Sequence, residues 1–281
     1  MKSPRKPRVP HATAPQKPTL APVGKAGPRE HDRHQGKAEE KYHGLRACES
    51  IYAHRPQDII RVYLAVERQR QFARLLGFCA RERKGFQVVA HDNLQRITGS
   101  IHHEGIAILA RAVRRWHSAD LMQSLLAGQH TGPLLYLDGV HNPHNLGSIV
   151  RVASHFGVTA LLGAQDDLPP LSPAAVRVAE GGAEHVNVYG IADPAADLHR
   201  LKQLGFRIVA TSGNRGDVVY TAPLAGKIVL VLGSEGVGIS RGIEALADQL
   251  IRIPGTGVVR SLNVSVACGI LLSEVWRRGL A

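Results

Sequence analysis

Cysteine, methionine and aromatic residues are scarce in this chain of 281 residues, which has three cysteines, two methionines and two tryptophans. Cys48, Cys79 and Cys268 are odd in number and lie far apart, so they do not form the framework of a disulfide-stapled secreted domain. The basic N-terminal stretch is not followed by the apolar segment of a signal peptide. We therefore expect a reduced, cytoplasmic protein.

The chain also lacks long apolar runs and is poor in acidic residues. No stretch approaches the ~18 apolar residues that a membrane helix needs, and no lipidation-type terminus is present, so we expect no membrane partner. Lys and Arg number 35 against 23 Asp and Glu, a formal net charge of +12. Such an excess favours a polyanionic partner, because each neutralised phosphate releases condensed counterions. Nucleic acid is the leading candidate.

Residues 1–41 hold a disproportionate share of this charge, with ten Lys and Arg, four acids and seven of the sixteen prolines. Almost no large apolar side chain is present, so burial cannot offset the entropy of ordering this segment. We expect a disordered basic arm that either raises RNA affinity or only solubilises the protein.

Residues 42–112 have the pattern of a small α/β domain, and 113–132 that of a linker with a short helix. Strands are expected at 58–65, 86–90 and 105–112, with helices at 44–55 and 67–83. The second helix is basic and either contacts RNA or is simply solvated. His102 and His103 have no ligand partner at metal spacing, so no metal site is predicted.

Residues 133–281 alternate short runs of Val, Ile and Leu with helical stretches. This alternation predicts an α/β domain with a parallel sheet that is covered on both faces. In such sheets ligands bind at the carboxyl ends of the strands, so the loops of unusual composition are the candidate sites.

The first such loop is HNPHNLGSIVRVASHFG, residues 141–157. Asn145 is suited to cap the following helix, and Arg151 is expected to lie over the bare surface of Gly147 with its guanidinium near the helix start. A helix start with an arginine favours an anion. The alternative is a capped helix with an exposed arginine.

The second loop is KIVLVLGSEGVGIS, residues 227–240. The glycine order differs from a dinucleotide fingerprint, and no Lys-Ser/Thr ending of a phosphate-binding loop follows. Glu235 would repel a pyrophosphate but could accept hydrogen bonds from a ribose. The loop therefore suits a nucleoside without phosphates, unless it is only a glycine-rich turn.

The third loop, IPGTGVVRSLNVSVACG at 253–269, enters an apolar helix. Capping needs only one polar residue, yet Arg260, Ser261 and Asn263 all stand at the helix start. This surplus points to a site, and the alternative for this loop taken alone is a capping cluster.

Together the loops resemble one family. NPHNLGSIVR, IVLVLGSEGVGIS and IRIPGTGVVRSLNVSVACGILLSE resemble, in order, the three motifs of the SpoU (TrmH-like) branch of the SPOUT RNA methyltransferases. AVRVAEGGAEHVNVY at 175–189 resembles the family too, and 42–111 is similar to the substrate-binding domain of many members. Gly255 and Asn142 depart from the usual Met and Asp.

The resemblance implies a SPOUT-type fold with a C-terminal trefoil knot, a homodimer formed through the catalytic domain, and transfer of a methyl group from S-adenosylmethionine to a ribose 2′-hydroxyl of rRNA or tRNA. It also implies site residues. The polar residues expected at the active site are Asn145, Arg151, Glu235, Ser261 and Asn263. The residues expected to line the cofactor pocket are Gly233, Ile253 and Leu262.

The resemblance implies that Arg151 assists loss of the ribose proton. Because arginine is essentially always protonated, we expect Arg151 mainly to clamp an RNA phosphate and stabilise the developing oxyanion, with direct proton abstraction as the alternative. Two other classes stay open at this point. One is a knotted RNA-binding or ribosome-assembly protein without turnover. The other is a nicotinamide-dependent dehydrogenase, which the glycine order and Glu235 disfavour.

Overall fold

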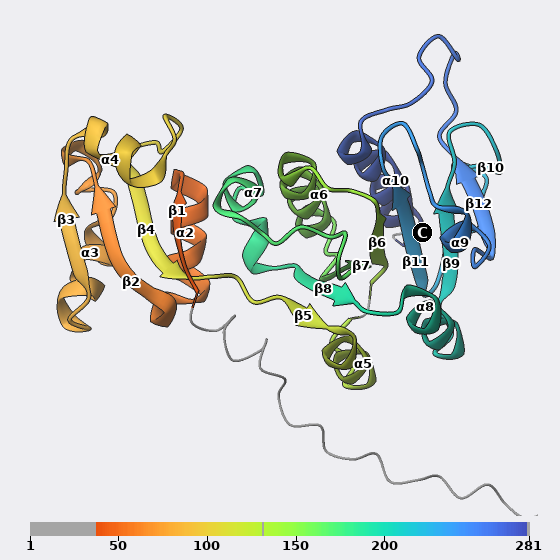
Figure 1. The fold of residues 1–281 in the computed structure, drawn as a ribbon, viewed down its shortest axis with the longest axis horizontal. Coiled ribbons are helices and arrows are strands. Elements are labelled where there is room, and N and C mark those ends of the chain that lie inside the picture. The colour runs from red at the N-terminus through yellow and green to blue at the C-terminus, as the bar shows by residue number, and fades with distance from the viewer. Residues whose placement is uncertain (1–37, 131, 280–281) are drawn as a thin grey trace, which may run out of the picture.

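The computed structural model describes residues 38–130 and 132–279, which form two sheets with their helices. Figure 1 shows the small sheet with its helices (the N-terminal unit) beside the large sheet with its helices (the C-terminal unit). Most of the predicted basic arm, residues 1–37, lies outside the described residues. None of the described helices is long and apolar enough to span a bilayer.

The small sheet has four strands in the order β1-β4-β2-β3, mixed parallel and antiparallel. Its strands are β1 (Glu39–His43), β2 (Ile59–Leu64), β3 (Gly85–Val88) and β4 (Ile106–Arg111). Its helices are α2 (Leu45–His54), α3 (Ala73–Arg81) and α4 (His91–Thr98). The strands and helices expected in this part of the chain are present, and α4 is an addition that the apolar pattern did not indicate.

The predicted boundary of the arm is wrong at its C-terminal end. Glu39, Glu40 and Lys41 belong to β1, which pairs antiparallel with β4. These residues are polar because β1 is an edge strand, and only Tyr42 and His43 at its end are buried. Strand pairing with a distant partner orders a segment that composition alone assigns to the arm.

The large sheet has eight strands, all parallel, in the order β10-β12-β9-β11-β6-β7-β8-β5. Its strands are β5 (Trp116–His117), β6 (Leu134–Asp138), β7 (Ala160–Ala164), β8 (Asn187–Ile191), β9 (Arg207–Thr211), β10 (Asp217–Val218), β11 (Ile228–Gly233) and β12 (Gln249–Arg252). Its helices are α5 (Ser118–Leu126), α6 (Pro143–His155), α7 (Pro173–Val178), α8 (Pro194–Gln203), α9 (Arg241–Glu244) and α10 (Val264–Gly279). The parallel sheet predicted from the sequence is confirmed.

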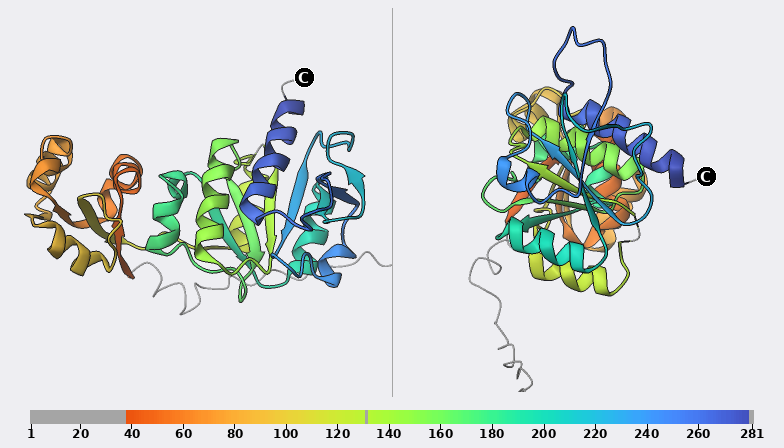
Figure 2. Two further views of the ribbon diagram at one scale, coloured as in Figure 1. Left: turned by 90° about the horizontal axis from the view of Figure 1, so that it is seen from above. Right: turned by 90° about the vertical axis from the view of Figure 1, so that its right-hand side faces the viewer.

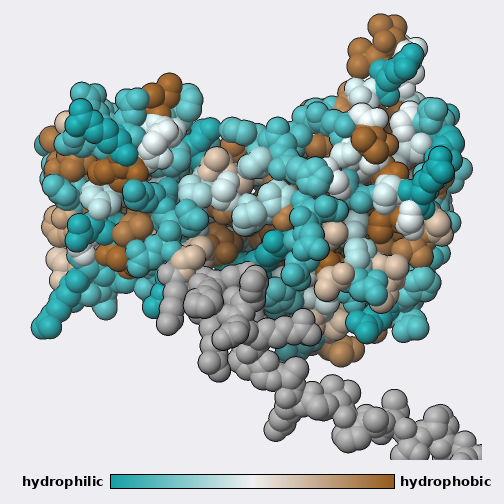
Figure 3. All heavy atoms as spheres, in the orientation of Figure 1, coloured by the Kyte–Doolittle hydropathy of each residue, from teal (hydrophilic) through white to brown (hydrophobic). Residues whose placement is uncertain are grey.

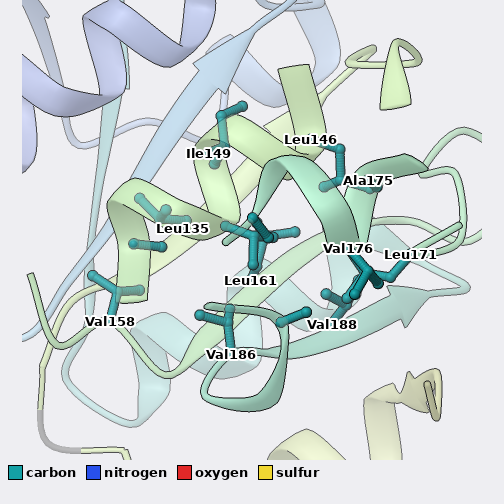
Figure 4. Close-up of a cluster of buried hydrophobic side chains, with 14 of the residues drawn as sticks. Leu135, Leu146, Ile149, Val158, Leu161, Leu171, Ala175, Val176, Val186 and Val188 are labelled. Carbon is teal, nitrogen blue, oxygen red and sulfur yellow. The ribbon is translucent and has the colours of Figure 1, made fainter. Parts of the chain in front are cut away.

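Successive side chains of each central strand enter two different cores. Leu134 and Tyr136 of β6 pack in one apolar cluster, whereas Leu135 and Leu137 pack in the other. Figure 2 shows helices on both faces of the large sheet, and Figure 4 shows the cluster that Leu135 shares with α6 and α7. A continuous apolar run therefore predicts a strand buried on both sides, as found here.

The segment 113–132, predicted as a linker with a short helix, contains α5 but also contributes β5 to the large sheet. A strand of two residues is too short to leave a periodic pattern. This part of the chain is thus structurally part of the C-terminal unit rather than a free connection.

The two units pack through the segment that follows α7. The Arg55 guanidinium of the N-terminal unit forms an ion pair with Glu184 at 2.9 Å, and both side chains are buried. Ser50 donates a hydrogen bond of 3.0 Å to the carbonyl of Gly181. These contacts place Gly181 and Glu184 of the segment AVRVAEGGAEHVNVY at the junction between the two units.

Helix α10 returns from β12 to pack against α6, so the C-terminal segment crosses back over the large sheet. Its end is fixed by Glu274, which accepts hydrogen bonds from Arg277 at 2.7 and 2.8 Å and from Arg278 at 2.7 Å. Arg278 also donates to the carbonyl oxygens of Val219 and Tyr220. The threading that would make this return a trefoil knot stays a prediction.

Replacing Glu274 with Gln is expected to destabilise this end of the protein in a pH-dependent way. Hydrogen bonds from Arg277 and Arg278 lower the pKa of Glu274 to about 2. A carboxyl group with a lowered pKa stabilises the fold above its unfolded pKa, and that contribution is lost as the pH falls towards 2. Urea unfolding at several pH values should show a constant difference from wild type above about pH 5. A difference that does not shrink between about pH 4.5 and 2 would contradict this assignment.

Candidate functional site

Three loops meet at the carboxyl edge of the large sheet because they follow strands that are close together in it. The loops follow β6, β11 and β12, and β11 lies between β6 and β9, which in turn pairs with β12. All of these strands run parallel, so their carboxyl ends lie on one edge. The three segments singled out in the sequence are therefore neighbours in space.

Asn145, Glu235 and Asn263 form one hydrogen-bonded cluster, with one residue from each loop. Glu235 Oε1 accepts from Asn145 Nδ2 at 3.0 Å, from Asn263 Nδ2 at 2.7 Å and from the backbone N–H of Val264 at 3.4 Å. Asn263 Nδ2 also donates to Asn145 Oδ1 at 3.0 Å. This arrangement joins residues that are up to 118 positions apart in the sequence.

The predicted capping role of Asn145 is wrong. Asn142 caps α6, since its side-chain oxygen accepts a hydrogen bond of 2.8 Å from the backbone N–H of His144, and Pro143 occupies the first helical position. Asn145 lies inside the first turn, where its amide is available to Glu235. Two asparagines three residues apart thus have separate roles, and only the tertiary contacts distinguish them.

Arg151 does not lie over Gly147 as predicted. A Cβ on Gly147 would stand 2.5 Å from the carbonyl oxygen of Ala175 and 2.9 Å from the Cβ of Val178, so α7 covers this glycine. Arg151 is exposed, and within the described part of the chain it makes neither a hydrogen bond nor an ion pair. Its guanidinium is therefore free for a ligand, although it is not joined to the cluster.

Replacing Gly147 with Ala is expected to destabilise the fold by about 1–3 kcal/mol, because the added methyl group overlaps the α7 backbone. Gly269 in α10 is the matched control, since a Cβ there would only reach Val152 Cγ1 at 3.9 Å. Gly269→Ala should be neutral or stabilise by up to ~1 kcal/mol, through the higher helix propensity of alanine. Chemical unfolding of both variants measures the difference, and equal stabilities would rule out the close contact with α7.

The second loop requires glycine for a close backbone contact. Ser234 and Gly238 exchange backbone hydrogen bonds of 3.0 and 3.2 Å, which close a tight turn that carries Glu235. A Cβ on Gly233 would stand 2.3 Å from the carbonyl carbon of Gly238. Gly233 therefore shapes the turn that presents Glu235, in addition to its expected place beside the cofactor.

Among the residues expected at the third loop, Asn263 is held by hydrogen bonds, whereas Ser261 and Leu262 are exposed to solvent. Asn263 directly precedes α10 and accepts hydrogen bonds from the backbone N–H and the hydroxyl of Ser265 at 2.9 and 2.6 Å. Ser261 is exposed and, among the described residues, has no hydrogen-bond partner. Ile253 is half-buried and Leu262 is 46% exposed. Ile253 packs against the hydrophobic core, and none of the three side chains forms a hydrogen bond with the Asn145–Glu235–Asn263 cluster in the described structure.

Two supporting residues were missed by sequence reasoning. Asp138, at the carboxyl end of β6, accepts a hydrogen bond of 2.6 Å from the backbone N–H of Ser240 and so fixes the far end of the second loop. Ser265 holds the Asn263 amide in place. An acid at a strand end was a visible signal for Asp138, whereas a serine inside a helix gave none for Ser265.

The arrangement limits the chemistry at this edge. No group of three or more potential metal ligands occurs among residues 38–130 and 132–279. Burial raises the pKa of Cys268 to about 12, so this thiol in α10 stays protonated and is not a nucleophile. What the edge offers is hydrogen-bonding amides, the carboxylates of Glu235 and Asp138, and the exposed guanidinium of Arg151.

Comparisons with known proteins agree with this architecture. Residues 132–273 match the model of the SpoU rRNA Methylase family, and residues 43–116 match that of the RNA 2′-O ribose methyltransferase substrate-binding domain. The 23S rRNA (guanosine-2′-O-)-methyltransferase RlmB of Haemophilus influenzae is 34% identical over 86% of this chain and 98% of its own length. The uncharacterized tRNA/rRNA methyltransferase YfiF of Escherichia coli O157:H7 is 34% identical over 89% of this chain and 71% of its own length.

Solved structures share the fold. The SpoU methyltransferase AviRb of Streptomyces viridochromogenes in complex with AdoMet is 21% identical, with a TM-score of 0.68 over 90% of this chain and 95% of its own. An AdoMet-bound rRNA methyltransferase of Sinorhizobium meliloti is 22% identical, with a TM-score of 0.70 over 90% of this chain and 92% of its own. With three motifs joined at one sheet edge and both family models matched, this chain belongs to the SpoU rRNA methylase family.

Proposed function

We propose that this protein transfers a methyl group from S-adenosylmethionine to the ribose 2′-hydroxyl of a guanosine in 23S rRNA. The observation that carries this proposal is the union of Asn145, Glu235 and Asn263, one from each motif, through direct hydrogen bonds. The relatives that align over nearly their whole length are named for this reaction. Membership of the family leaves no support for a nicotinamide-dependent dehydrogenase.

The residues at the loops fit S-adenosylmethionine as cofactor. Around Gly255 and Gly257 a Cβ would meet no atom within 4 Å, so the backbone of this loop is open to a flat ligand. Ile253 and Leu262 offer apolar surface, and Gly233 ends β11, which β9 separates from β12 in the same sheet. We propose that Gly233, Ile253 and Leu262 hold the cofactor, which when bound supplies a methyl group made electrophilic by its sulfonium.

The protein's own contribution is position and charge. The cluster of Asn145, Glu235 and Asn263 fixes the three loops relative to one another, and holding reactants in line can lower a barrier by as much as ~7–11 kcal/mol. Arg151, exposed and unpaired in the described structure, is proposed to clamp an RNA phosphate and to stabilise the oxyanion that develops on the ribose. Ser261, at the open side of the third loop, is proposed to orient the ribose.

We propose that the protein acts as a homodimer through the C-terminal unit. Several large apolar side chains are exposed there on the loop before α10 and on α10 itself, namely Val258, Val259, Leu262, Val266 and Trp276. Figure 1 shows this loop projecting from the molecule, and Figure 3 shows hydrophobic residues at its tip. An apolar surface of this kind is typical of an interaction site.

A protein that modifies rRNA would work in the cytoplasm, where the three buried free cysteines would stay reduced.

Methylation of defined RNA tests the proposal. The purified protein is incubated with tritiated S-adenosylmethionine and with unmodified 23S rRNA or tRNA, and alkali-resistant linkages are mapped, because a 2′-O-methyl group blocks cleavage at that nucleotide. We expect one resistant linkage after a guanosine in 23S rRNA. Transfer of the label to tRNA but not to 23S rRNA would show that the assigned substrate is wrong. Absence of both label and calorimetric cofactor binding would favour the RNA-binding protein without turnover.

A further inference from the structure

A hollow of about 460 Å³ lies where the two units meet, away from the three loops. The N-terminal unit lines it with α4 and with the turn 101–104, and the C-terminal unit lines it with Arg177 of α7. Arg177 belongs to the segment AVRVAEGGAEHVNVY, which the three-loop site does not use. A site that both units build can exist only in the packing described above.

Arg177 is the strongest positive charge of this hollow. The described structure gives it no ion pair and no hydrogen bond, while its stem packs against Gly44, whose added Cβ would stand 3.1 Å from Arg177 Cγ. Burial lowers the pKa of His43, which neighbours this stem, and of His103, which lines the hollow. These histidines are therefore mostly neutral at pH 7, and the fixed cation is Arg177.

The other lining groups complement a nucleotide rather than a bare anion. Glu104 is engaged by the backbone N–H of Leu45 at 2.7 Å, which reduces its repulsion of an anion near Arg177. Asp92 and Gln95 on α4 offer hydrogen-bonding groups to a base edge, and Ile101, an exposed apolar side chain, offers a surface for a base. Unpaired bases in RNA loops are recognised through such edge and surface contacts.

Next to the hollow, the junction of the two units buries a ring nitrogen that lacks a hydrogen-bond partner among the described residues. His43 is only 5% exposed, and its Nδ1 has no partner among the described residues. Arg177, His102 and His103 are the charged or titratable groups that act on it electrostatically, so it belongs to the same basic neighbourhood.

We propose that this hollow binds an unpaired nucleotide of the RNA substrate, distinct from the one that is methylated, with its phosphate on Arg177 and its base against α4 and Ile101. This inference rests on the proposed function, because it takes RNA as the substrate. It assigns α7 the role of linking substrate recognition by the N-terminal unit to the C-terminal unit. The RNA would then bridge both units.

Arg177→Met tests this assignment, because methionine keeps an unbranched apolar stem against Gly44 and removes only the charge. We expect RNA affinity, measured by filter binding with unmodified 23S rRNA fragments, to fall about fivefold to tenfold, and the slope of log K against log salt to decrease by about one. Lys227→Met is the matched control. Lys227 directly precedes β11 and therefore lies at the edge of the sheet opposite to the three loops. Its replacement should leave both the RNA affinity and the salt slope unchanged.

Thermal melting and calorimetric binding of S-adenosylmethionine keep the outcomes separate. Unchanged melting and cofactor affinity in Arg177→Met, together with weaker RNA binding, would support the site. Wild-type RNA affinity and salt slope in Arg177→Met would overturn it, even if methylation by the wild-type protein establishes the proposed function. If the wild-type protein methylates no RNA but still binds it through Arg177, the proposed function fails and the binding site stands.

Discussion

Replacing Glu235 with Ala is expected to lower kcat/KM for RNA methylation by at least about 100-fold, a loss of ~2.7 kcal/mol in transition-state stabilisation. Glu235 Oε1 is the shared acceptor for Asn145, Asn263 and the first backbone N–H of α10. Removing it deprives Asn145 Nδ2 and the α10 backbone N–H of this acceptor and leaves Asn263 Nδ2 bonded to Asn145 alone. The turn that carries residue 235 then loses its link to the other two loops, although the hydrogen bond from Ser240 to Asp138 still holds the far end of the second loop.

Glu235→Gln separates geometry from charge. Its amide oxygen can still accept from both asparagines, so we expect a loss of only about tenfold, the difference between charged and neutral acceptors. Glu82→Ala, an exposed acid at the end of α3, is the control and should retain wild-type kinetics. If Glu235→Ala turns over RNA like the wild type, the cluster is not what positions the loops for catalysis.

Replacing Arg151 with Lys is the second substitution with a large expected effect. Lysine keeps the positive charge but not the planar, two-pronged donor set that grips a phosphate or an oxyanion. Arg151 is exposed and unpaired in the described structure, so the change should not disturb the fold. We expect kcat to fall by about 100-fold, the typical cost of losing a donor to a developing oxyanion.

Single-turnover methylation measures this loss, and calorimetry measures cofactor affinity, which should be unchanged. Arg200→Lys on α8 is the matched control, since its partner Asp197 can pair with either side chain. Near wild-type turnover by Arg151→Lys would show that a point charge is sufficient and that the bidentate clamp is wrong.

Much of the C-terminal unit could be predicted from the sequence. The short runs of Val, Ile and Leu in residues 133–281 predicted the longer strands of the large sheet, because the central strands are buried on both faces and their side chains alternate between two cores, as Leu134 to Leu137 do. The parallel direction followed from the intervening helices, and it placed the candidate loops at one edge. These features depend on local pattern, which the chain carries in itself.

Short and polar elements could not be predicted in this way. β1 begins at Glu39 in a charged segment, and β5 consists of Trp116 and His117 alone. Each is a strand only because it pairs with a distant partner, β4 or β8. Composition placed the start of β1 in the arm and β5 in a linker, because local composition contains no information about a distant partner strand.

The site shows the same division. The sequence by itself determined which loops are unusual, since Arg260, Ser261 and Asn263 exceed what one cap requires and Glu235 stands among glycines. Only the tertiary structure decided that Asn142 is the cap, that α7 covers Gly147, and that Arg151 stands apart from the cluster. The physical reason is that capping and helical spacing are set within a few residues, whereas side-chain partners are chosen among all groups that folding brings within hydrogen-bonding distance.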